Sequence, residues 1–474
     1  MNRLSLAYFL GAGSASYSGV PSLRLETRIS KNKKLMISIK AANFFFLGIT
    51  VLTLPVIGCT GLFAPKKSPA QVVNTTTATV SSTPIPKTLF GMHIQEPTKT
   101  PWPAVNVGAL RVFVPWFFIQ PNKGEWKFEI LDKYVDLAEQ QGVEVLYVFN
   151  DTPKWAAARP NEVGEWGKDF PGVASEPKDM EDWRNFVRTV ATRYKGRIRA
   201  YQIWNETNNK NDYSGSIEKM VEMAQEAYKV LKEVDTNIII VSPGAIAGLD
   251  LPGNESWISL GGVDWLDQYF AKGAAAYTDV VGPHLYSIKE KTPEERVQTI
   301  RRMQQVMAKH KLSHKPLWDT ENAYAKFPNE QPFTDEEARG FIARTYIIYW
   351  ASGISRFYWY AWDVNTQIHP NWLKMVQADN KTLTPASIAY SEVQKWLIGA
   401  TMKSCQPDSN KIWICQVTRD NNYTGWIVWN PEGKLPFKVP SNWNIKQVRD
   451  LAGGKSTLPA SGSVEIGRSP ILLD

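Results

Sequence analysis

Between residues 89 and 396 the apolar pattern alternates between short runs rich in β-branched residues and longer segments with helical spacing. A run that is apolar at every position, such as residues 238–241, is typical of a strand buried on both faces of a parallel sheet. Eight short runs of strand character predict strands, at Leu89–Ile94, Ala109–Val114, Val143–Phe149, Ala200–Trp204, Asn237–Val241, Asp279–Gly282, Pro316–Asp319 and Arg356–Tyr360.

Helical spacing recurs between these strands, and Gly142 and Gly353 follow two of the helical segments, where a left-handed cap favours glycine. The expected helices are Glu129–Gln141, Glu181–Tyr194, Ser216–Val234, Thr292–Lys311 and Asp335–Ser352. Repeated β and α units predict an α/β fold, and eight of them predict a (β/α)8 TIM barrel over residues 87–396. An open doubly wound sheet is the alternative. Such a sheet would need a glycine-rich phosphate loop after an early strand, and the sequence has none there.

After Trp396 the helical spacing stops, and short strand-like pieces separated by turn residues predict a small β-sandwich-like domain over residues 397–474. These pieces are Lys411–Val417, Gly425–Val428, Phe437–Val439, Lys446–Leu451 and Ser463–Ile466. A unit of this size is small for independent stability, so we expect it to pack on the barrel. For this C-terminal domain we favour a structural role over carbohydrate binding. Cys405 and Cys415 are a candidate disulfide, and two free thiols are the alternative.

The N-terminal segment has the order of a secretory signal, with basic residues before an apolar run from Ala41 to Gly58. The run ends at Cys59 in a sequence that resembles a bacterial lipobox, which makes Cys59 a candidate lipid anchor. We interpret residues 1–59 as this signal and residues 60–86 as a flexible linker rich in Ser, Thr and Pro. An uncleaved membrane-spanning helix is the alternative. A start at Met36 would account for the preceding residues, and both readings place the body outside the cytoplasm, in a secreted or membrane-anchored protein.

The net charge of +8 belongs to this N-terminal segment, because residues 1–67 hold nine Lys or Arg and a single acid. The rest of the chain is neutral, which argues against a nucleic-acid partner and suits an uncharged substrate. The five histidines are scattered without the paired spacing of a zinc site. We therefore expect no metal and no cofactor. The oligomeric state stays open.

Active sites of barrel enzymes form at the carboxyl ends of the strands, so polar and aromatic residues at those ends are the candidates. They are Arg111, Asn150, Asn205, Glu206, His284, Tyr286, Glu321 and Trp362. Glu206 and Glu321 each follow an apolar strand, the fourth and the seventh, where a solvated surface carboxylate has no reason to lie. Two carboxylates facing each other are what glycoside hydrolysis requires, with one to protonate the leaving oxygen and one to act on the anomeric carbon.

The ordered set resembles the clan A glycoside hydrolases, most of all family 39, with its β-xylosidases and α-iduronidases, or a family 5-like relative. Trp204-Asn205-Glu206 matches the strand-four motif of the clan, and Glu321 is placed like its strand-seven glutamate. The resemblance implies a retaining enzyme that cleaves an extracellular oligo- or polysaccharide. In it Glu206 is the acid/base and Glu321 the nucleophile.

The other residues of the set take supporting roles in the same resemblance. Asn205 would hydrogen-bond the 2-hydroxyl of the sugar, Arg111 and Tyr286 would stabilise Glu321, and His284 would orient Glu206 or bind a hydroxyl. Asn150 and Trp362 are the remaining substrate-binding candidates.

Structural readings compete with these roles: a core histidine for His284, a barrel salt bridge for Arg111 and a turn residue for Asn205. Asp319 is expected in the barrel interior or behind the site rather than in the chemistry. Among the tryptophans at strand ends, Trp155, Trp359 and Trp362, we select Trp362, whereas Trp116, Trp166 and Trp372 are expected in loops. A non-catalytic carbohydrate-binding protein and a transglycosylase remain the alternative functions.

Overall fold

The computed structural model describes residues 82–97, 99–248, 258–287, 292–326, 330–364, 371–420 and 422–474. The predicted signal segment with Cys59, and the linker up to residue 81, lie outside these residues. Among the residues that the structure describes, no helix has the length and apolar character needed to cross a membrane.

Seven parallel strands form the main sheet in the order β5-β4-β3-β2-β1-β9-β8. Their bounds are β1 Phe90–His93, β2 Ala109–Phe113, β3 Glu144–Phe149, β4 Ala200–Ile203, β5 Ile239–Val241, β8 Leu317–Asn322 and β9 Ile354–Trp359. Val280 forms a parallel bridge with Val241 of β5, and Val281 forms one with Leu317 of β8. The strand predicted at Asp279–Gly282 is thus reduced to two bridges, and these close the barrel. The predicted barrel class is confirmed.

A short additional pair of parallel strands, β6 Ile246–Gly248 and β7 His284–Ser287, extends the chain beyond the closing bridges. The strand prediction ended before this pair, although β7 carries both His284 and Tyr286. The predicted strand at Arg356–Tyr360 is also shifted, since β9 begins two residues earlier at Ile354.

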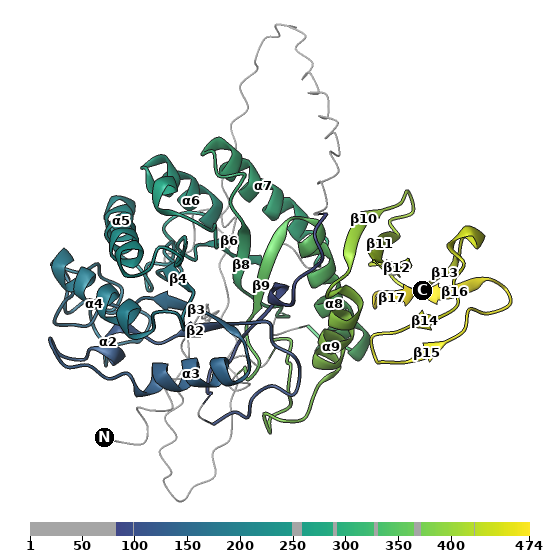
Figure 1. Ribbon diagram of the computed structural model, residues 1–474, viewed down its shortest axis with the longest axis horizontal. Helices are drawn as coiled ribbons and strands as arrows, with labels where there is room; N and C mark the ends of the chain where they lie inside the picture. Colours follow the sequence, from purple (N-terminus) through teal and green to yellow (C-terminus); the bar gives the residue numbers. More distant parts are fainter. Residues whose placement is uncertain are drawn as a thin grey trace, which may run out of the picture. The chain divides into compact units, whose positions relative to one another are not determined.

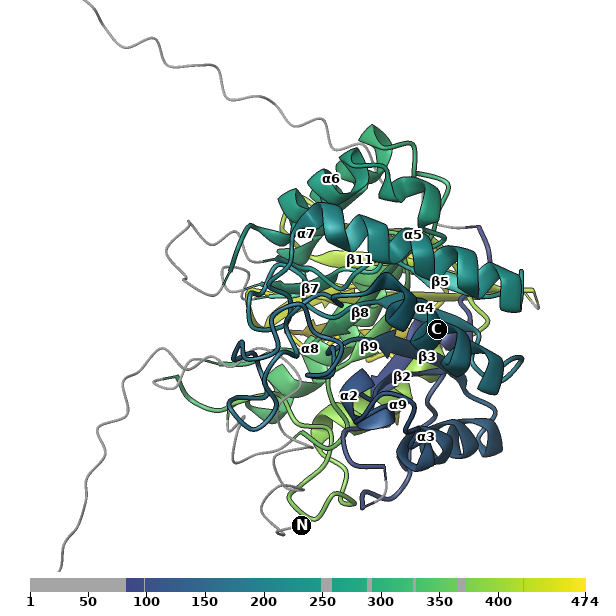
Figure 2. The same ribbon diagram turned by 90° about the vertical axis from the view of Figure 1, so that its left-hand side faces the viewer.

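Helices lie outside the strands in both views of the ribbon (Figures 1 and 2). The helices of the barrel are α2 Trp116–Ile119, α3 Glu129–Gln140, α4 Met180–Arg193, α5 Ile217–Val234, α6 Gly262–Ala271, α7 Arg296–Lys309, α8 Asp335–Ala351 and α9 Pro385–Leu397, with short 3-10 turns at Lys87–Leu89 and Ala274–Tyr277. The five predicted helices are confirmed, and Gly142 and Gly353 take positive φ values of 62° and 87° at their ends.

Three helices of this set were not predicted, α2, α6 and α9. Trp116, which we expected in a loop, begins α2 and is buried against Trp183 and Phe186. The start of α9 did carry a sequence signal, because the Thr384 hydroxyl caps the helix and a proline occupies its first turn.

The C-terminal region forms a six-stranded sheet in the order β10-β11-β12-β17-β14-β15, with a separate two-stranded pair of β13 and β16. Its strands are β10 Thr401–Pro407, β11 Trp413–Arg419, β12 Tyr423–Trp429, β13 Leu435–Lys438, β14 Val448–Arg449, β15 Lys455–Ser456, β16 Ser463–Ile466 and β17 Ile471–Leu473, and a 3-10 turn covers Ser441–Trp443. Apolar residues of the pair and the sheet share one core, which gives two packed layers. Cys405 and Cys415 lie directly opposite each other on β10 and β11 and are joined by a disulfide.

Two layers of side chains fill the inside of the barrel. The lower layer is apolar and consists of Ala109, Leu146, Ala200, Val241, Val280, Trp318 and Tyr358. Because side chains of a strand alternate, the residues two positions further along point inward as well, and at three strands these are Arg111, Gln202 and Thr320. A polar layer therefore packs on a buried apolar layer, directly below the mouth of the barrel.

Candidate active site

Irregular backbone places the two glutamates at this mouth. Trp204 and Glu206, just after β4, have positive φ values of 75° and 29°, a conformation that costs a non-glycine residue free energy and concentrates at functional sites. In β8 the pairing with β9 shifts register between Asp319 and Asn322. Such a bulge redirects side chains, so Thr320 and Glu321 both reach the barrel centre although they are neighbours.

Arg111 is the centre of the polar layer, and its fully buried guanidinium contacts four side chains. It donates to Glu321 Oε2 at 2.6 Å, to Asn205 Oδ1 at 3.0 Å and to Gln202 Oε1 at 2.9 Å. Its Nη2 also lies 3.2 Å from Nε2 of His284. We considered two roles for Arg111, a salt bridge within the barrel and a charge partner of Glu321. The ion pair between Arg111 and Glu321 serves as both.

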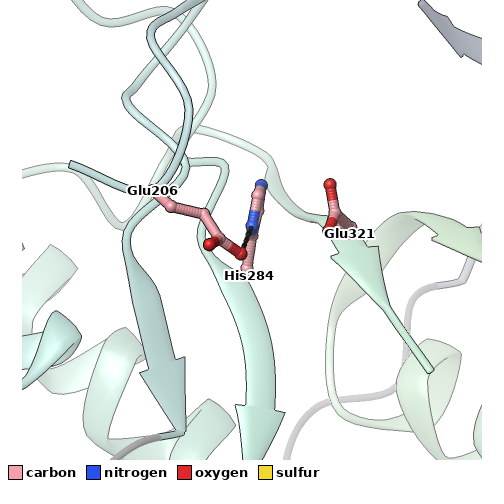
Figure 3. Close-up of side chains that lie close together, drawn as sticks. All are labelled: Glu206, His284 and Glu321. Carbon is pink, nitrogen blue, oxygen red and sulfur yellow. Dashed lines mark hydrogen bonds and ion pairs between the residues drawn. The ribbon is translucent and has the colours of Figure 1, made fainter. Parts of the chain in front are cut away.

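The contacts of His284 fix its tautomer. A guanidinium only donates hydrogen bonds, so Nε2 of His284 must accept from Arg111 and the ring hydrogen must lie on Nδ1. That Nδ1 is 3.2 Å from Glu206 Oε1, the contact drawn as a dashed line in Figure 3. Burial, followed by the charge of Arg111, lowers the pKa of His284 well below its usual value. His284 is thus a neutral donor to Glu206.

Glu206 is fully buried in a setting that favours its protonated form. Burial, then the negative charges of Asp212, Glu321 and Glu165, raise the pKa of Glu206 well above its ordinary value, against a lowering by Arg111. Within the described residues, its Oε2 has no hydrogen-bond partner. Because Oε1 accepts from His284, the proton of a neutral Glu206 belongs on Oε2.

Glu321 has the opposite surroundings. Its Oε2 accepts from Arg111 in a fully buried ion pair, and its Oε1 accepts from the hydroxyl of Tyr286 at 3.2 Å. Both oxygens thus receive donors that stabilise the ionised form. Figure 3 shows the side chains of Glu206, His284 and Glu321 close together, with Glu206 in the segment after β4, His284 at the start of β7 and Glu321 near the end of β8. One oxygen of each glutamate and one ring nitrogen of His284 all lie within 4.8 Å of one another.

Glu206, His284 and Glu321 have the residue types of a metal site, but their charges are already compensated. Arg111 donates to Glu321 and to the lone pair of His284 Nε2, so two of the three ligands are engaged by a cation. A second cation beside a buried guanidinium would meet like-charge repulsion. The donor set suits proton transfer better than metal binding.

Asn150 and Trp362 are placed differently from the cluster. The Asn150 amide donates to its neighbour Asp151, and its Oδ1 is buried without a partner in the described part of the chain. Trp362 is buried, with its backbone N–H bonded to the His93 carbonyl. The hydrogen bond of the Asn150 amide is therefore to Asp151 rather than to Glu206 or Glu321, and the Trp362 indole N–H has no hydrogen-bond partner in the described part of the chain.

Of the other tryptophans, two contact residues away from the two glutamates and one contacts Tyr286, the partner of Glu321. Trp155 packs edge-on against Trp116, and Trp166 donates to Asp151. Trp372, which we expected in a loop, is only partly buried and lies edge-on to Tyr286 with ring centroids 6.1 Å apart. Trp372 is thus the better candidate for stacking on a sugar near Glu321.

Sequence reasoning did not select three further residues around the cluster. Gln202 accepts from Arg111 and donates to Thr320, and its position in an otherwise apolar strand could have revealed it. Asp212 accepts from the Asn205 amide at 3.0 Å. Gly244 lies against His284, since a Cβ there would come within 2.4 Å of Nε2. Asp319 lies behind the site as expected, where it accepts from the backbone N–H of Leu285, between His284 and Tyr286.

Comparison with known families identifies this architecture. Residues 128–390, more than half of the chain, match the family model described as the glycosyl hydrolase catalytic core. The chain belongs to this glycosyl hydrolase family. The match includes β3 to β9 and both candidate glutamates.

Solved glycoside hydrolases share the fold. A family 39 glycoside hydrolase from Bacteroides cellulosilyticus WH2 superposes with a TM-score of 0.64 at 17% identity, over 82% of this chain and 81% of that one. A family 30 endoxylanase from Clostridium papyrosolvens C71 superposes with a TM-score of 0.54 at 14% identity, over 83% and 97%. The predicted likeness to clan A enzymes of the family 39 type is confirmed at the level of fold.

Two curated sequences match a short part of this glycosyl hydrolase. Both are named endo-1,4-beta-xylanase A, from Caldicellulosiruptor sp. (strain Rt8B.4) and from Thermotoga neapolitana, and each is 30% identical over 105 and 102 residues respectively. The matches span 20% of this chain, and 14% and 9% of the two relatives.

Proposed function

We propose that this protein is a retaining glycoside hydrolase, with Glu206 as the acid/base and Glu321 as the nucleophile. The observation that carries the proposal is that two glutamates have opposite environments while an oxygen of one lies within 4.8 Å of an oxygen of the other. A short separation suits direct attack on the sugar, because inverting enzymes leave room for a water between carboxyl groups about 6.5–9.5 Å apart.

The first step follows from the contacts. Glu321, held as an anion by Arg111 and Tyr286, attacks the anomeric carbon. Glu206 gives the proton on Oε2 to the departing glycosidic oxygen, which breaks the C–O bond and leaves a covalent glycosyl ester on Glu321.

The second step reverses the role of Glu206. As a carboxylate it takes a proton from water, which attacks the anomeric carbon and releases Glu321. The neutral His284 donates to Oε1 throughout, so it orients Glu206 without competing for the transferred proton.

Substitution of each glutamate tests the assignment. With an aryl glycoside that has an activated leaving group, Glu321→Ala should abolish turnover, while azide should partly restore turnover to Glu206→Ala by replacing the water that this variant cannot activate. Unchanged hydrolysis in either variant would overturn the mechanism, whereas a wild-type protein that binds the glycosides but hydrolyses none of them would favour a barrel that binds carbohydrate without cleaving it. Product analysis with added sugar acceptors separates hydrolysis from transglycosylation.

The substrate to test first is a β-1,4-linked xylan, because both curated relatives are named endo-1,4-beta-xylanases. A panel of aryl xylosides, glucosides, mannosides and arabinosides defines the preferred sugar. Higher activity on aryl xylosides than on the rest of the panel is the expected result.

We further propose that the protein acts outside the cytoplasm, anchored through a lipid on Cys59. Support comes from the order of basic residues, an apolar run and a cysteine after a small residue in the N-terminal segment. Palmitate labelling that is lost in Cys59→Ser, with release of the protein from membranes, is the expected result. Retention of the unlabelled variant in the membrane would favour an uncleaved anchor.

A further inference from the structure

Three acids on the side of the proton donor have no part in the two-glutamate mechanism: two are buried, and Glu165 is partly buried. We call Asp151, Glu165 and Asp212 the acidic cluster. Asp151 and Glu165 both raise the pKa of Asp212 by their charge, after the larger effect of its burial. Among the three, Asp212 has the largest charge effect on Glu206.

Asp212 is held close to Glu206 by a tight turn after β4. The backbone N–H of Asn209 donates to the Glu206 carbonyl at 2.7 Å, and the N–H of Asp212 donates to the Asn209 carbonyl at 3.1 Å. The indole of Trp204 donates to the Asp212 carbonyl at 2.9 Å. These bonds return the chain to the strand end that it has just left.

The side chain of Asp212 determines which way the Asn205 amide points. Asp212 Oδ1 accepts from Asn205 Nδ2 at 3.0 Å, while Asn205 Oδ1 accepts from Arg111 at 3.0 Å. A flipped amide would set its NH2 against a guanidinium and its oxygen against a carboxylate, so only one orientation is favourable. Asp212 Oδ2 accepts from Asn209 Nδ2 at 2.6 Å, so each carboxylate oxygen accepts from an amide. These two donors favour the ionised form of Asp212 and oppose the effect of burial, which raises its pKa.

We propose that Asp212 is a positioning residue whose carboxylate orients Asn205 against Arg111 and supplies the negative charge that keeps a proton on Glu206. The inference rests on the proposed glycosidase function and deepens it. The other charged groups facing Glu206 are Glu321 from β8, Glu165 from the loop after β3, and Arg111 from β2, whereas His284 from β7 is neutral.

Two substitutions separate these effects. Asp212→Asn removes the charge but keeps an oxygen for the Asn205 amide, whereas Asp212→Ala removes both. Asp169→Asn is the matched control, because Asp169 is exposed on the neighbouring loop and its substitution makes the same change in charge.

The first readout is the pH profile of kcat/KM on an aryl glycoside with a poor leaving group. Activity requires protonated Glu206, so it falls as pH rises through the pKa of that group. Loss of a negative neighbour should move this fall in Asp212→Asn to lower pH by about one unit. Asp169→Asn should keep the wild-type profile. An unmoved profile in Asp212→Asn, or a loss that is equal at every pH, would overturn the inference.

The second readout is the preference for a substrate with a 2-hydroxyl over its 2-deoxy analogue. Asp212→Ala should reduce this preference on the order of tenfold, because an unbraced amide holds the hydroxyl less well, while Asp212→Asn should keep most of it. Equal preferences in wild type and both variants would overturn the orienting role.

Glu206→Gln distinguishes failure of this inference from failure of the proposed function. If that variant loses the alkaline fall and Asp212→Asn retains it unchanged, only the role of Asp212 is overturned. If wild type cleaves none of the glycosides, the proposed function is overturned together with this inference.

Discussion

The two glutamates differ in what surrounds them far more than in how they are reached. Both lie at strand ends of one barrel and both are buried. Glu321 accepts hydrogen bonds from a guanidinium and a tyrosine hydroxyl, whereas Glu206 accepts one from a neutral histidine and is faced by the negative charges of Asp212, Glu165 and Glu321 itself. The same side chain is thereby prepared as an anion on one side and as an acid on the other. In the proposed mechanism, the neighbours of the two glutamates, rather than their residue type, divide the two roles.

The largest expected effect comes from exchanging each carboxyl for an amide. Glu321→Gln should lose on the order of 10⁴-fold or more in kcat on every aryl glycoside, because no nucleophile remains. Glu206→Gln should lose about 10²–10⁴-fold on a poor leaving group, and far less on a dinitrophenyl glycoside that departs without a proton. Steady-state rates across a series of leaving groups measure the difference. Equal dependence on the leaving group in both variants would contradict the division of roles.

Removal of Arg111 should weaken the anionic side. Arg111→Met leaves Glu321 buried without its cation, which should cost about 3–5 kcal/mol of unfolding free energy and about 10²–10³-fold in kcat. Arg111→Lys keeps the charge but not the fork that reaches Asn205 and Gln202, so it should recover part of both losses. Denaturant unfolding and kcat on one aryl glycoside provide the two measurements. Wild-type kcat in Arg111→Met would mean that Glu321 needs no partner.

A smaller effect is expected at Gly244, whose lack of a side chain leaves room for His284, the donor to Glu206. In Gly244→Ala the new Cβ would lie 2.4 Å from His284 Nε2, so the imidazole must move and its bond to Glu206 must lengthen. We expect a loss of about tenfold in kcat/KM on a poor leaving group, with a smaller loss on an activated one. An equal loss on both substrates would show that the damage does not pass through the acid.

The smallest effect concerns stability on the acid side. Burial, followed by a charge effect of Glu165, raises the pKa of Asp151 to about 8, against lowering by hydrogen bonds from Trp166 and Asn150. The folded protein therefore holds a proton that the unfolded chain releases near pH 3.8, so stability falls as pH rises from that value towards about 8.

Asp151→Asn removes this loss and suits the positive φ of 59° at that position. Its Tm should match wild type near pH 4 and exceed it by a few degrees at pH 8.5. Thermal unfolding of Asp151→Asn and of the exposed control Asp169→Asn tests this. A lower Tm than wild type at both pH values would show that Asp151 is needed as a carboxylate.

The strand-end rule accounts for what the sequence could predict. Arg111, Glu206, His284, Tyr286 and Glu321 were selected because parallel strands bring their carboxyl ends to one face, and the structure brings all five together. Asn150 satisfies the same rule, but its amide donates to Asp151. Position along a strand determines the face, and local hydrogen bonds determine the direction of the side chain.

The missed residues depend on backbone that strand periodicity does not describe. Asp212 reaches Asn205 through a turn of several residues. Gly244 forms a parallel β-bridge with Asn205 and lies against the His284 ring. Glu321 itself points inward because β8 changes register near Asp319, whereas strict alternation would have excluded either Thr320 or Glu321. Side-chain roles that arise from bulges and turns required the three-dimensional structure.

Trapping of the covalent intermediate tests the central claim most directly. In a 2-deoxy-2-fluoro sugar the fluorine slows both steps, while a dinitrophenyl leaving group speeds the first step only. The glycosyl ester therefore accumulates and can be located by peptide mass spectrometry. We predict a single adduct on the peptide that contains Glu321, absent from Glu321→Gln. An adduct on any other residue, or complete cleavage of the compound without an adduct, would contradict the account.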